Sequence, residues 1–291
     1  MQQVTVAATQ FACGPDRARN IATAERMVRE AAGQGAQIVM LPELFETPYF
    51  AKDQRQEFFA LARPIDRNPM LARMSELAQE LEIVLPVPFF ERANNAYFNA
   101  VMVMNADGEP LGSYRKSHIP DGYGYEEKFY FNPGDTGFRV WDTAYLKLGI
   151  GICWDQWFPE CARAMALQGA DLLLYPTAIG STIDEPQPSS RPRWQRAMQG
   201  HAVSNCMPVA AANRIGTEKG HSADITFYGA SFIAAPDGEI VADAGDKEAI
   251  VTAQFDFEAI RLERAAWGFF RDRRPELYTS LLTLDGAHWV E

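Results

Sequence analysis

One cysteine of the chain stands where a layered α/β fold would place a nucleophile. Residues 145–160 (YLKLGIGICWDQWFPE) hold an apolar run that ends at Cys153, and Pro159 and Glu160 then have the residue types of a helix start. Catalytic groups in such folds lie at the carboxyl ends of strands, where backbone N–H groups are free. Cys153 is therefore a candidate nucleophile, although a free cysteine is also a common small core residue.

A glutamate and a lysine elsewhere in the chain have the side chains that such a cysteine needs. Glu43 follows the apolar residues 35–42, and a carboxylate in apolar surroundings is a better proton acceptor than one in water. Lys116 follows a predicted hairpin, and beside Cys153 its charge would favour the thiolate and stabilise an oxyanion. Taken alone, Glu43 could equally be a surface acid at a strand end, and Lys116 a solvated loop residue.

The elements that would position these residues occur twice. Residues 35–43 (GAQIVMLPE) and 169–177 (GADLLLYPT) align without a gap, so Glu43 and Thr177 hold equivalent places. In each copy a predicted helix precedes this segment, and a second helix, a strand and an Asp-Gly hairpin follow it. The predicted ranges are 17–32, 70–80, 83–90 and 101–109 in the first copy, and 160–168, 192–206, 208–213 and 231–239 in the second.

This repeat predicts an α/β architecture with internal twofold pseudosymmetry. Short β-α-β units make parallel strands with helices on one face, and the hairpins extend each sheet in mixed orientation. Two such halves would stack sheet on sheet as an α-β-β-α sandwich. Glu43, Cys153 and Thr177 would then lie along one rim of a single domain that spans residues 1–291.

Composition restricts the partners of the protein. The net charge of -11 and the pI near 4.9 oppose binding to nucleic acid or to an anionic membrane, because both need a basic face. The amino terminus lacks the features of a signal peptide and no stretch has the length of a membrane span, so we expect a cytoplasmic protein. The cysteines have no metal-binding spacing and His118 and His201 have no ligand partner nearby, so we predict no metal and no cofactor.

Three blocks of the chain resemble the signature blocks of the nitrilase superfamily, in the same order. They are PELF with Glu43, RKSHIP with Lys116 and GICWD with Cys153. The resemblance implies an α-β-β-α sandwich and a Glu-Lys-Cys triad. It also implies a second glutamate about eleven residues after the lysine, in a block that ends in Pro-Gly. Glu127 in EKFYFNPG fits this place, and Glu126 beside it leaves the choice open.

Longer matches resemble the branch of this superfamily that hydrolyses carbamoylated aliphatic amines. They include YPTAIGS at 175–181, MQGHA at 198–202, ANRIG at 212–216 and TFYG at 226–229. The resemblance implies attack by Cys153 on a carbamoyl carbon, with Glu43 moving the protons and Lys116 and the N–H of Trp154 holding the oxyanion. The implied substrate is a small cationic carbamoylated amine.

The cationic end of such a substrate needs an opposed carboxylate. Where the branch has GSEP, residues 180–186 read GSTIDEP, an apparent insertion of three residues, so either Asp184 or Glu185 is the predicted partner of the ammonium. The other predicted substrate-binding residues are Tyr49 and Trp154, as walls for the methylene chain, together with Thr177 and Ala178.

Two other functions are compatible with the predicted fold. An enzyme that hydrolyses carbamoyl amino acids or dicarboxylate monoamides would need a basic residue in the pocket to bind the substrate carboxylate. A catalytically silent binding protein would have no chemical reason to keep Glu43, Lys116 and Cys153 together. The resemblance also implies a homodimer or a larger homo-oligomer, and residues 267–275 (WGFFRDRRP) favour subunit contacts through a C-terminal tail, about 257–291.

Overall fold

The first half of the chain, together with one strand from near its end, builds one mixed sheet. The computed structural model describes residues 3–182 and 189–287. Strands β1 and β2 run parallel, and a parallel bridge between Ile38 and Val84 continues the sheet to β3. Strands β3, β4 and β5 form an antiparallel meander, and β15 runs antiparallel to β1 on the other edge. The bounds are β1 (Gln3–Gln10), β2 (Ile38–Met40), β3 (Leu85–Ala93), β4 (Ala96–Met104), β5 (Pro110–Arg115) and β15 (Ala249–Asp256).

The second half builds a sheet of the same plan. Its order is β6-β7-β8-β10-β13-β14, with β7, β8 and β10 parallel and the remaining neighbours antiparallel. Strand for strand this matches β15-β1-β2-β3-β4-β5, so the predicted internal repeat is confirmed. The bounds are β6 (Val140–Asp142), β7 (Lys147–Ile150), β8 (Leu172–Pro176), β10 (Val209–Ala212), β13 (Phe232–Ala234) and β14 (Ile240–Asp243).

The four predicted helices form with ends within one residue of the predicted ones. They are α1 (Arg17–Gly33), α2 (Pro69–Leu81), α3 (Pro159–Leu167) and α4 (Arg191–Asn205). Asp16 caps α1 by accepting from the N–H of Arg19, and Asn68 caps α2 ahead of Pro69. These starts are stable because a side-chain oxygen satisfies a free N–H group and a proline at the first position has none to satisfy.

The Asp-Gly turns of the two halves also match. Gly108 and Gly238 have φ angles of +83° and +85°, in the left-handed region that glycine adopts without strain. In each turn the preceding aspartate accepts a hydrogen bond from the N–H two residues on, at 3.1 Å from Asp107 and 3.0 Å from Asp237. The chain therefore reverses direction by the same local chemistry in both copies.

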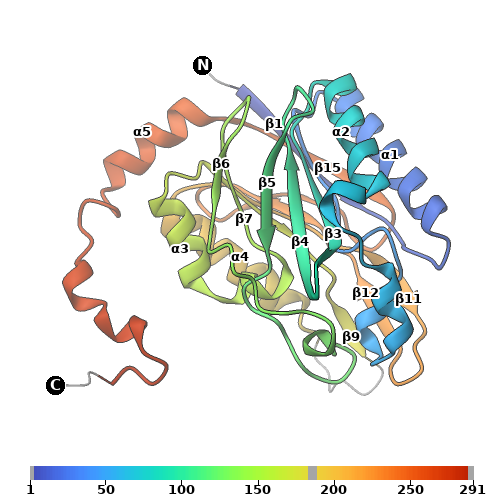
Figure 1. Cartoon of the computed structure of the whole chain (residues 1–291). Coiled ribbons are helices and arrows are strands. Elements are labelled where there is room, and N and C mark those ends of the chain that lie inside the picture. Colours follow the sequence, from blue (N-terminus) through green and yellow to red (C-terminus); the bar gives the residue numbers. More distant parts are fainter. Residues whose placement is uncertain (1–2, 183–188, 288–291) are drawn as a thin grey trace.

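Three apolar layers hold the two sheets and four helices together. In β2, Ile38 and Met40 face the other sheet while Val39 faces α1 and α2; in β8, Leu172 and Leu174 face the other sheet while Leu173 faces α3 and α4. This alternation follows from the opposite directions of successive side chains in a strand. The result is the α-β-β-α sandwich predicted from the sequence (Figure 1).

Two parts of the described chain lie outside the sandwich. A small sheet of β9 (Gly180–Thr182), β12 (Ile225–Tyr228) and β11 (Ile215–Glu218), which the sequence did not predict, forms beside the strand ends. Helix α5 (Phe257–Trp267) buries Phe257 and Ile260 in the core between the sheets, and the tail beyond it lies on the side of α3, with Phe270 packed against the core of the second half (Figure 1). Its short 3-10 turns are η6 (Pro275–Leu277) and η7 (Thr279–Leu282). No helix within the described ranges is long and apolar enough to cross a membrane.

Candidate active site

Three strand ends meet on one rim of the sandwich. Glu43 follows β2, Thr177 follows β8, and Cys153 lies shortly after β7. The N–H of Glu43 donates to the carbonyl oxygen of Thr177 at 3.3 Å, so the two equivalent positions of the repeat are in direct contact. The rim predicted from the sequence is present because the two halves stack with the carboxyl ends of their parallel strands together.

Cys153 occupies a strained turn between β7 and α3. Its φ angle is +41°, in the left-handed region that residues other than glycine adopt only when the surroundings enforce it. Asp155 supplies that constraint: one of its oxygens accepts from the N–H of Ile152 at 2.9 Å and from the Tyr114 hydroxyl at 2.7 Å. The 3-10 turn η5 (Cys153–Trp157) then leads into α3, and the thiol of Cys153 contacts the carbonyl oxygen of Ala178 at 3.8 Å.

Lys116 is completely enclosed between two carboxylates. Its Nζ donates to Oε1 of Glu43 at 2.9 Å and to Oε2 of Glu127 at 2.6 Å. The backbone fixes its place, because the N–H of Lys116 continues the pairing of β4 and β5 by donating to the carbonyl oxygen of Asn99 at 2.8 Å. The turn η4 (Glu127–Phe129) brings Glu127 to the lysine. An ammonium has three donors, so one N–H remains for a substrate oxygen.

Glu43 and Glu127 differ in how their oxygens are used. Both oxygens of Glu127 accept hydrogen bonds, Oε2 from Lys116 and Oε1 from the Tyr49 hydroxyl at 2.6 Å. On Glu43, Oε1 accepts from Lys116 and from Nδ2 of Asn99, the latter at 2.7 Å. Oε2 of Glu43 is buried and has no hydrogen-bond partner in the described part of the chain. Glu43 therefore keeps one oxygen that can take a proton.

Burial and the charges of this cluster raise the pKa of the Cys153 thiol. Burial raises the pKa of the Cys153 thiol well above its ordinary value, Glu43 raises it further, and Lys116 offsets only part of the rise. Burial alone would lower the pKa of Lys116, but Glu127 and Glu43 together raise it. Burial also raises the pKa of Glu127 by more than Lys116 lowers it. Lys116 acts in the direction expected from the sequence, because its charge lowers the pKa of the thiol, but burial and Glu43 outweigh it.

A cavity of about 370 Å³ opens onto Cys153, a volume within the usual range for small-molecule sites. Trp154 and Trp157 line it with their ring centroids 6.4 Å apart, and Ala178 contributes to the same lining. Two charged residues, Asp121 and Arg193, also line it, and both are exposed. The pocket is therefore aromatic beside the thiol and carries one acid and one base at its exposed side.

The structure places two of the predicted substrate residues in this pocket and two behind it. Trp154, which is 40% exposed, and Ala178 line it. Tyr49 is fully buried, so its predicted contact with a methylene chain does not fit its position, and its hydroxyl instead holds Glu127. Thr177 is also fully buried, and its hydroxyl donates to Gln156 at 3.2 Å.

The remaining predicted positions are Asp184, Glu185 and Glu127. Asp184 and Glu185, the predicted partners of the ammonium, lie outside the described residues. The structure distinguishes Glu127 from its neighbour, because Glu127 contacts Lys116 whereas Glu126 accepts from Nε2 of Gln54 at 2.8 Å near the surface. The second glutamate of the cluster is therefore Glu127.

Two side chains of the site, Asn99 and Asp155, are not among the residues predicted from the sequence. Asn99 is a polar residue inside the apolar strand β4. It is fully buried, and its side chain donates a hydrogen bond to Glu43. Asp155 is also fully buried, and besides the turn at Ile152 it binds the N–H and the ring Nδ1 of His118, at 3.0 and 2.7 Å. A polar residue within an apolar run and an acid two residues after the cysteine were the available signals.

The histidines have structural partners. His118 stacks on Phe158 with ring centroids 3.6 Å apart, besides its contact with Asp155. Burial lowers the pKa of His201, so its ring is neutral and Nε2 donates to the carbonyl oxygen of Gln156 at 2.8 Å. Within residues 3–182 and 189–287, no three metal-ligating side chains cluster in a way that could hold an ion.

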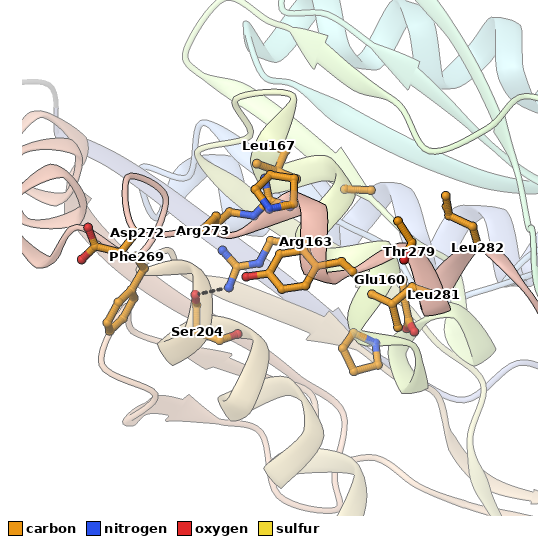
Figure 2. Close-up of a pocket in the computed structure, with 14 residues that line it drawn as sticks. Glu160, Arg163, Leu167, Ser204, Phe269, Asp272, Arg273, Thr279, Leu281 and Leu282 are labelled. Atoms are coloured by element: carbon orange, nitrogen blue, oxygen red, sulfur yellow. Dashed lines mark hydrogen bonds between the residues drawn. The ribbon is translucent and has the colours of Figure 1, made fainter. Parts of the chain in front are cut away.

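A larger cavity, of about 980 Å³, lies away from the thiol. Figure 2 shows it between α3 and the C-terminal tail, where Arg163 donates from Nη2 to the carbonyl oxygen of Ser204 at 2.7 Å. Tail residues such as Leu281 and Leu282 form part of its wall, and none of Glu43, Lys116 and Cys153 does. The chemistry of the lining, and not the volume, identifies the smaller cavity as the candidate active site.

Known proteins with similar sequences and structures show the family of this chain. The family model described as carbon-nitrogen hydrolase matches residues 5–265. The chain belongs to the carbon-nitrogen hydrolase family. N-carbamoylputrescine amidase of Solanum tuberosum is 59% identical to it, over 99% of this chain and 98% of that protein. Citrullinase of Francisella tularensis is 49% identical, over 97% and 99% of the two chains. The crystal structure of a carbon-nitrogen hydrolase from Helicobacter pylori superposes with a TM-score of 0.92 at 38% identity, covering 97% and 99%.

Proposed function

We propose that this protein hydrolyses the carbamoyl group of N-carbamoylputrescine, releasing putrescine, carbon dioxide and ammonia. The observation that carries the proposal is a pocket-lining thiol beside a lysine held between two carboxylates, one of which keeps a free oxygen. The substrate is suggested by the Solanum tuberosum relative, whose name states that activity.

In the first step, Cys153 attacks the carbamoyl carbon while Oε2 of Glu43 accepts the thiol proton. The remaining N–H of Lys116 and the backbone N–H of Trp154 stabilise the oxyanion that forms. Glu43 then gives the proton to the leaving nitrogen, the C–N bond breaks, and the carbonyl carbon stays on sulfur as a thioester. The raised pKa of Cys153 makes this proton transfer necessary, since the resting thiol is a weak nucleophile.

In the second step, water loses a proton to Glu43 and attacks the thioester carbon. The C–S bond breaks, the sulfur regains a proton, and the carbamic acid that is released divides into carbon dioxide and an amine. One water is consumed overall, and R–NH–CO–NH₂ becomes R–NH₂, carbon dioxide and ammonia. Glu127 keeps Lys116 in position through both steps.

Ammonia release from a panel of carbamoylated amines and carbamoyl amino acids tests the proposed substrate. N-carbamoylputrescine should show the highest kcat/KM, and a clear preference for another member of the panel would overturn the assignment. Cys153→Ala should release no ammonia while keeping its circular dichroism spectrum, because alanine fits a site of this size. Appreciable hydrolysis by the pure variant would remove the thioester mechanism.

We propose that a carboxylate beside the pocket binds the ammonium of the substrate, with Glu185 or Asp184 as the partner suggested by the sequence. Glu185→Gln should weaken capture of N-carbamoylputrescine by about 2 kcal/mol or more, and capture of uncharged N-carbamoylbutylamine much less. Equal losses for both substrates would exclude an ammonium partner at Glu185. Asp184→Asn and Asp121→Asn are the matched comparisons, and a selective loss in one of them would move the assignment to that residue.

Arg193 favours a second candidate function. Neither Arg193 nor Asp121 has an ion-pair partner among the described residues, and together they would suit a substrate end that carries both a carboxylate and an ammonium. An ω-ureido α-amino acid such as citrulline has that end, and the Francisella tularensis relative is named citrullinase. Arg193→Gln should then lower kcat/KM for citrulline and leave that for N-carbamoylputrescine unchanged. Citrulline turnover unaffected by the substitution would remove this role of Arg193.

We further propose that the C-terminal tail, about 257–291, joins copies of the chain in a homodimer or a larger homo-oligomer. Several of its large apolar side chains are in solvent, including Leu262 at 73%, Leu282 at 86% and Leu284 at 110% of full exposure. A run of exposed apolar side chains marks an interaction surface. Light scattering should give a multiple of 32.5 kDa for the wild type and a lower mass for Leu282→Glu. A monomeric wild type would contradict this.

A further inference from the structure

The backbone just before and at Tyr49 is held by three buried charged side chains that take no part in the proposed chemistry. The N–H of Tyr49 donates to Oε2 of Glu218 at 2.6 Å, and its carbonyl oxygen accepts from Nζ of Lys52 at 3.0 Å. Two residues earlier, the carbonyl oxygen of Thr47 accepts from Nη2 of Arg214 at 2.7 Å. We call Lys52, Arg214 and Glu218 the Tyr49 clamp.

The clamp is a cluster of charged side chains in the protein interior, where an unpaired charge is unfavourable. Arg214 is completely buried, Lys52 is 5% exposed and Glu218 is 8% exposed. Glu218 lies 3.5 Å from Arg214 and 3.8 Å from Lys52, so its carboxylate balances both cations. Burial lowers the pKa of Lys52, and the charge of Glu218 offsets only part of this. A buried ion pair adds little to stability compared with apolar residues of the same volume, so another role is needed to explain it.

The clamp connects to the candidate active site through the Tyr49 side chain. The ring of Tyr49 packs edge-on against Tyr125 and Phe227, with centroids 5.8 and 5.7 Å away, so the direction of the side chain is fixed. Its hydroxyl donates to Oε1 of Glu127 at 2.6 Å. Glu127 in turn contacts Lys116. A displacement of the Tyr49 backbone would therefore displace Glu127 and, through it, the lysine that is proposed to face the reacting carbonyl.

We propose that Glu218, with Lys52 and Arg214, positions Glu127 for the reaction through the Tyr49 peptide. The inference rests on the proposed function of the site, because it assigns the clamp to the orientation of Lys116 during hydrolysis. Glu218 is a positioning residue, because it is not one of the residues that line the pocket. Its effect should appear in kcat, since Lys116 stabilises charge that develops in the transition state, and much less in KM.

A double-mutant cycle between Glu218→Gln and Tyr49→Phe tests this. The glutamine side chain would keep an acceptor for the Tyr49 N–H but lose the charge that balances Lys52 and Arg214, so the fold should survive. Each single variant should lower kcat about fivefold, and the double variant should be no slower than either one, because both act through the same hydrogen bond to Glu127. A double variant about twenty-fivefold slower than wild type would show independent effects and overturn the inference.

Asp171→Asn is the matched control. Asp171 is a buried carboxylate, 4% exposed, that accepts from Nε and Nη2 of the exposed Arg261 at 2.9 and 2.7 Å, just before β8, at the end opposite the thiol. This variant should lose thermal stability without losing kcat per folded molecule. If Glu218→Gln behaves in the same way, the clamp only stabilises the fold and the inference is wrong. All rates are taken with the substrate that the wild type turns over fastest, so a different substrate would overturn the proposed function without affecting the cycle.

Discussion

Glu43 and Glu127 both contact Nζ of Lys116, at 2.9 and 2.6 Å, and both side chains are essentially unexposed. Their remaining contacts separate them. The second oxygen of Glu127 accepts from Tyr49, whereas the second oxygen of Glu43 has no partner within the described chain. Both glutamates contact the same lysine, but within the described chain only Glu43 keeps an oxygen without a hydrogen-bond partner, so the two can act differently in the reaction. We propose that the contacts of each oxygen, and not the presence of a carboxylate, select the base.

Asn99 is the residue that makes this difference. By donating to the oxygen of Glu43 that already contacts Lys116, it concentrates two donors on Oε1. Oε2 is then the oxygen of Glu43 that is left free to accept a proton. Tyr49 has the opposite effect on Glu127, since its donation occupies the oxygen that Lys116 leaves free. Four substitutions, in order of expected effect, test this account.

Glu43→Gln should cause the largest loss. Glutamine keeps the volume and can still accept from Lys116, but it cannot take the thiol proton, so kcat should fall about 10³-fold or more. Steady-state ammonia release at pH 7.5 measures the loss. A variant that keeps a tenth of wild-type kcat would give the role of base to another group.

Glu127→Gln should lose less, about 10²-fold in kcat, because it weakens the hold on Lys116 and leaves the proton acceptor in place. The same assay on the same day ranks the two variants. If Glu127→Gln is as slow as Glu43→Gln or slower, the assignment of the base to Glu43 and of a positioning role to Glu127 is wrong.

Asn99→Leu should lower kcat about tenfold with little change in KM, because Glu43 loses one of the two donors that orient it. Asn20→Leu is the control, since Asn20 is also buried and hydrogen-bonded but serves the backbone at Gly14 and Glu46. Equal kcat losses in the two variants would mean that Asn99 only supports the fold.

Tyr49→Phe should have the smallest effect, about fivefold in kcat, and a characteristic pH dependence. The hydrogen bond from Tyr49 lowers the pKa of Glu127, so its removal raises that pKa further. Glu127 is then protonated, and its hold on Lys116 lost, at a higher pH than in wild type. The acidic limb of the plot of kcat/KM against pH should therefore move to higher pH, and a shift to lower pH would contradict the assigned bond.

Much of the fold could be predicted because the same pattern of apolar residues occurs twice in the chain. Residues 35–43 and 169–177 specify β2 and β8, and the flanking helices follow from their own periodicity. Glu43 could be placed near Cys153 because both follow strands that end at the same rim. The small sheet of β9, β11 and β12 could not be predicted, since its strands are short and two of them are exposed in part.

The partners of the charged groups could not be predicted, because they join segments far apart in the chain. Tyr49 and Glu127 are 78 residues apart, and Asn99 and Glu43 are 56 apart. Tyr49 is predicted from the sequence as a wall for the methylene chain, yet its ring packs between Tyr125 and Phe227. Sequence pattern indicates which face of an element is buried, but not which polar atoms meet there.

The most direct test of the central claim, that Glu43 and not Glu127 takes the proton of Cys153, is the rate at which the thioester forms. Excess Glu43→Gln or Glu127→Gln enzyme is mixed with substrate, quenched at intervals and weighed intact by mass spectrometry. We predict that Glu127→Gln forms the adduct on Cys153, more slowly than the wild type, and that Glu43→Gln forms almost none over the same time at pH 7.5. Because Glu43 is also assigned to the second step, any adduct formed in its absence would accumulate. A Glu43→Gln enzyme that acylates as fast as Glu127→Gln would contradict the account.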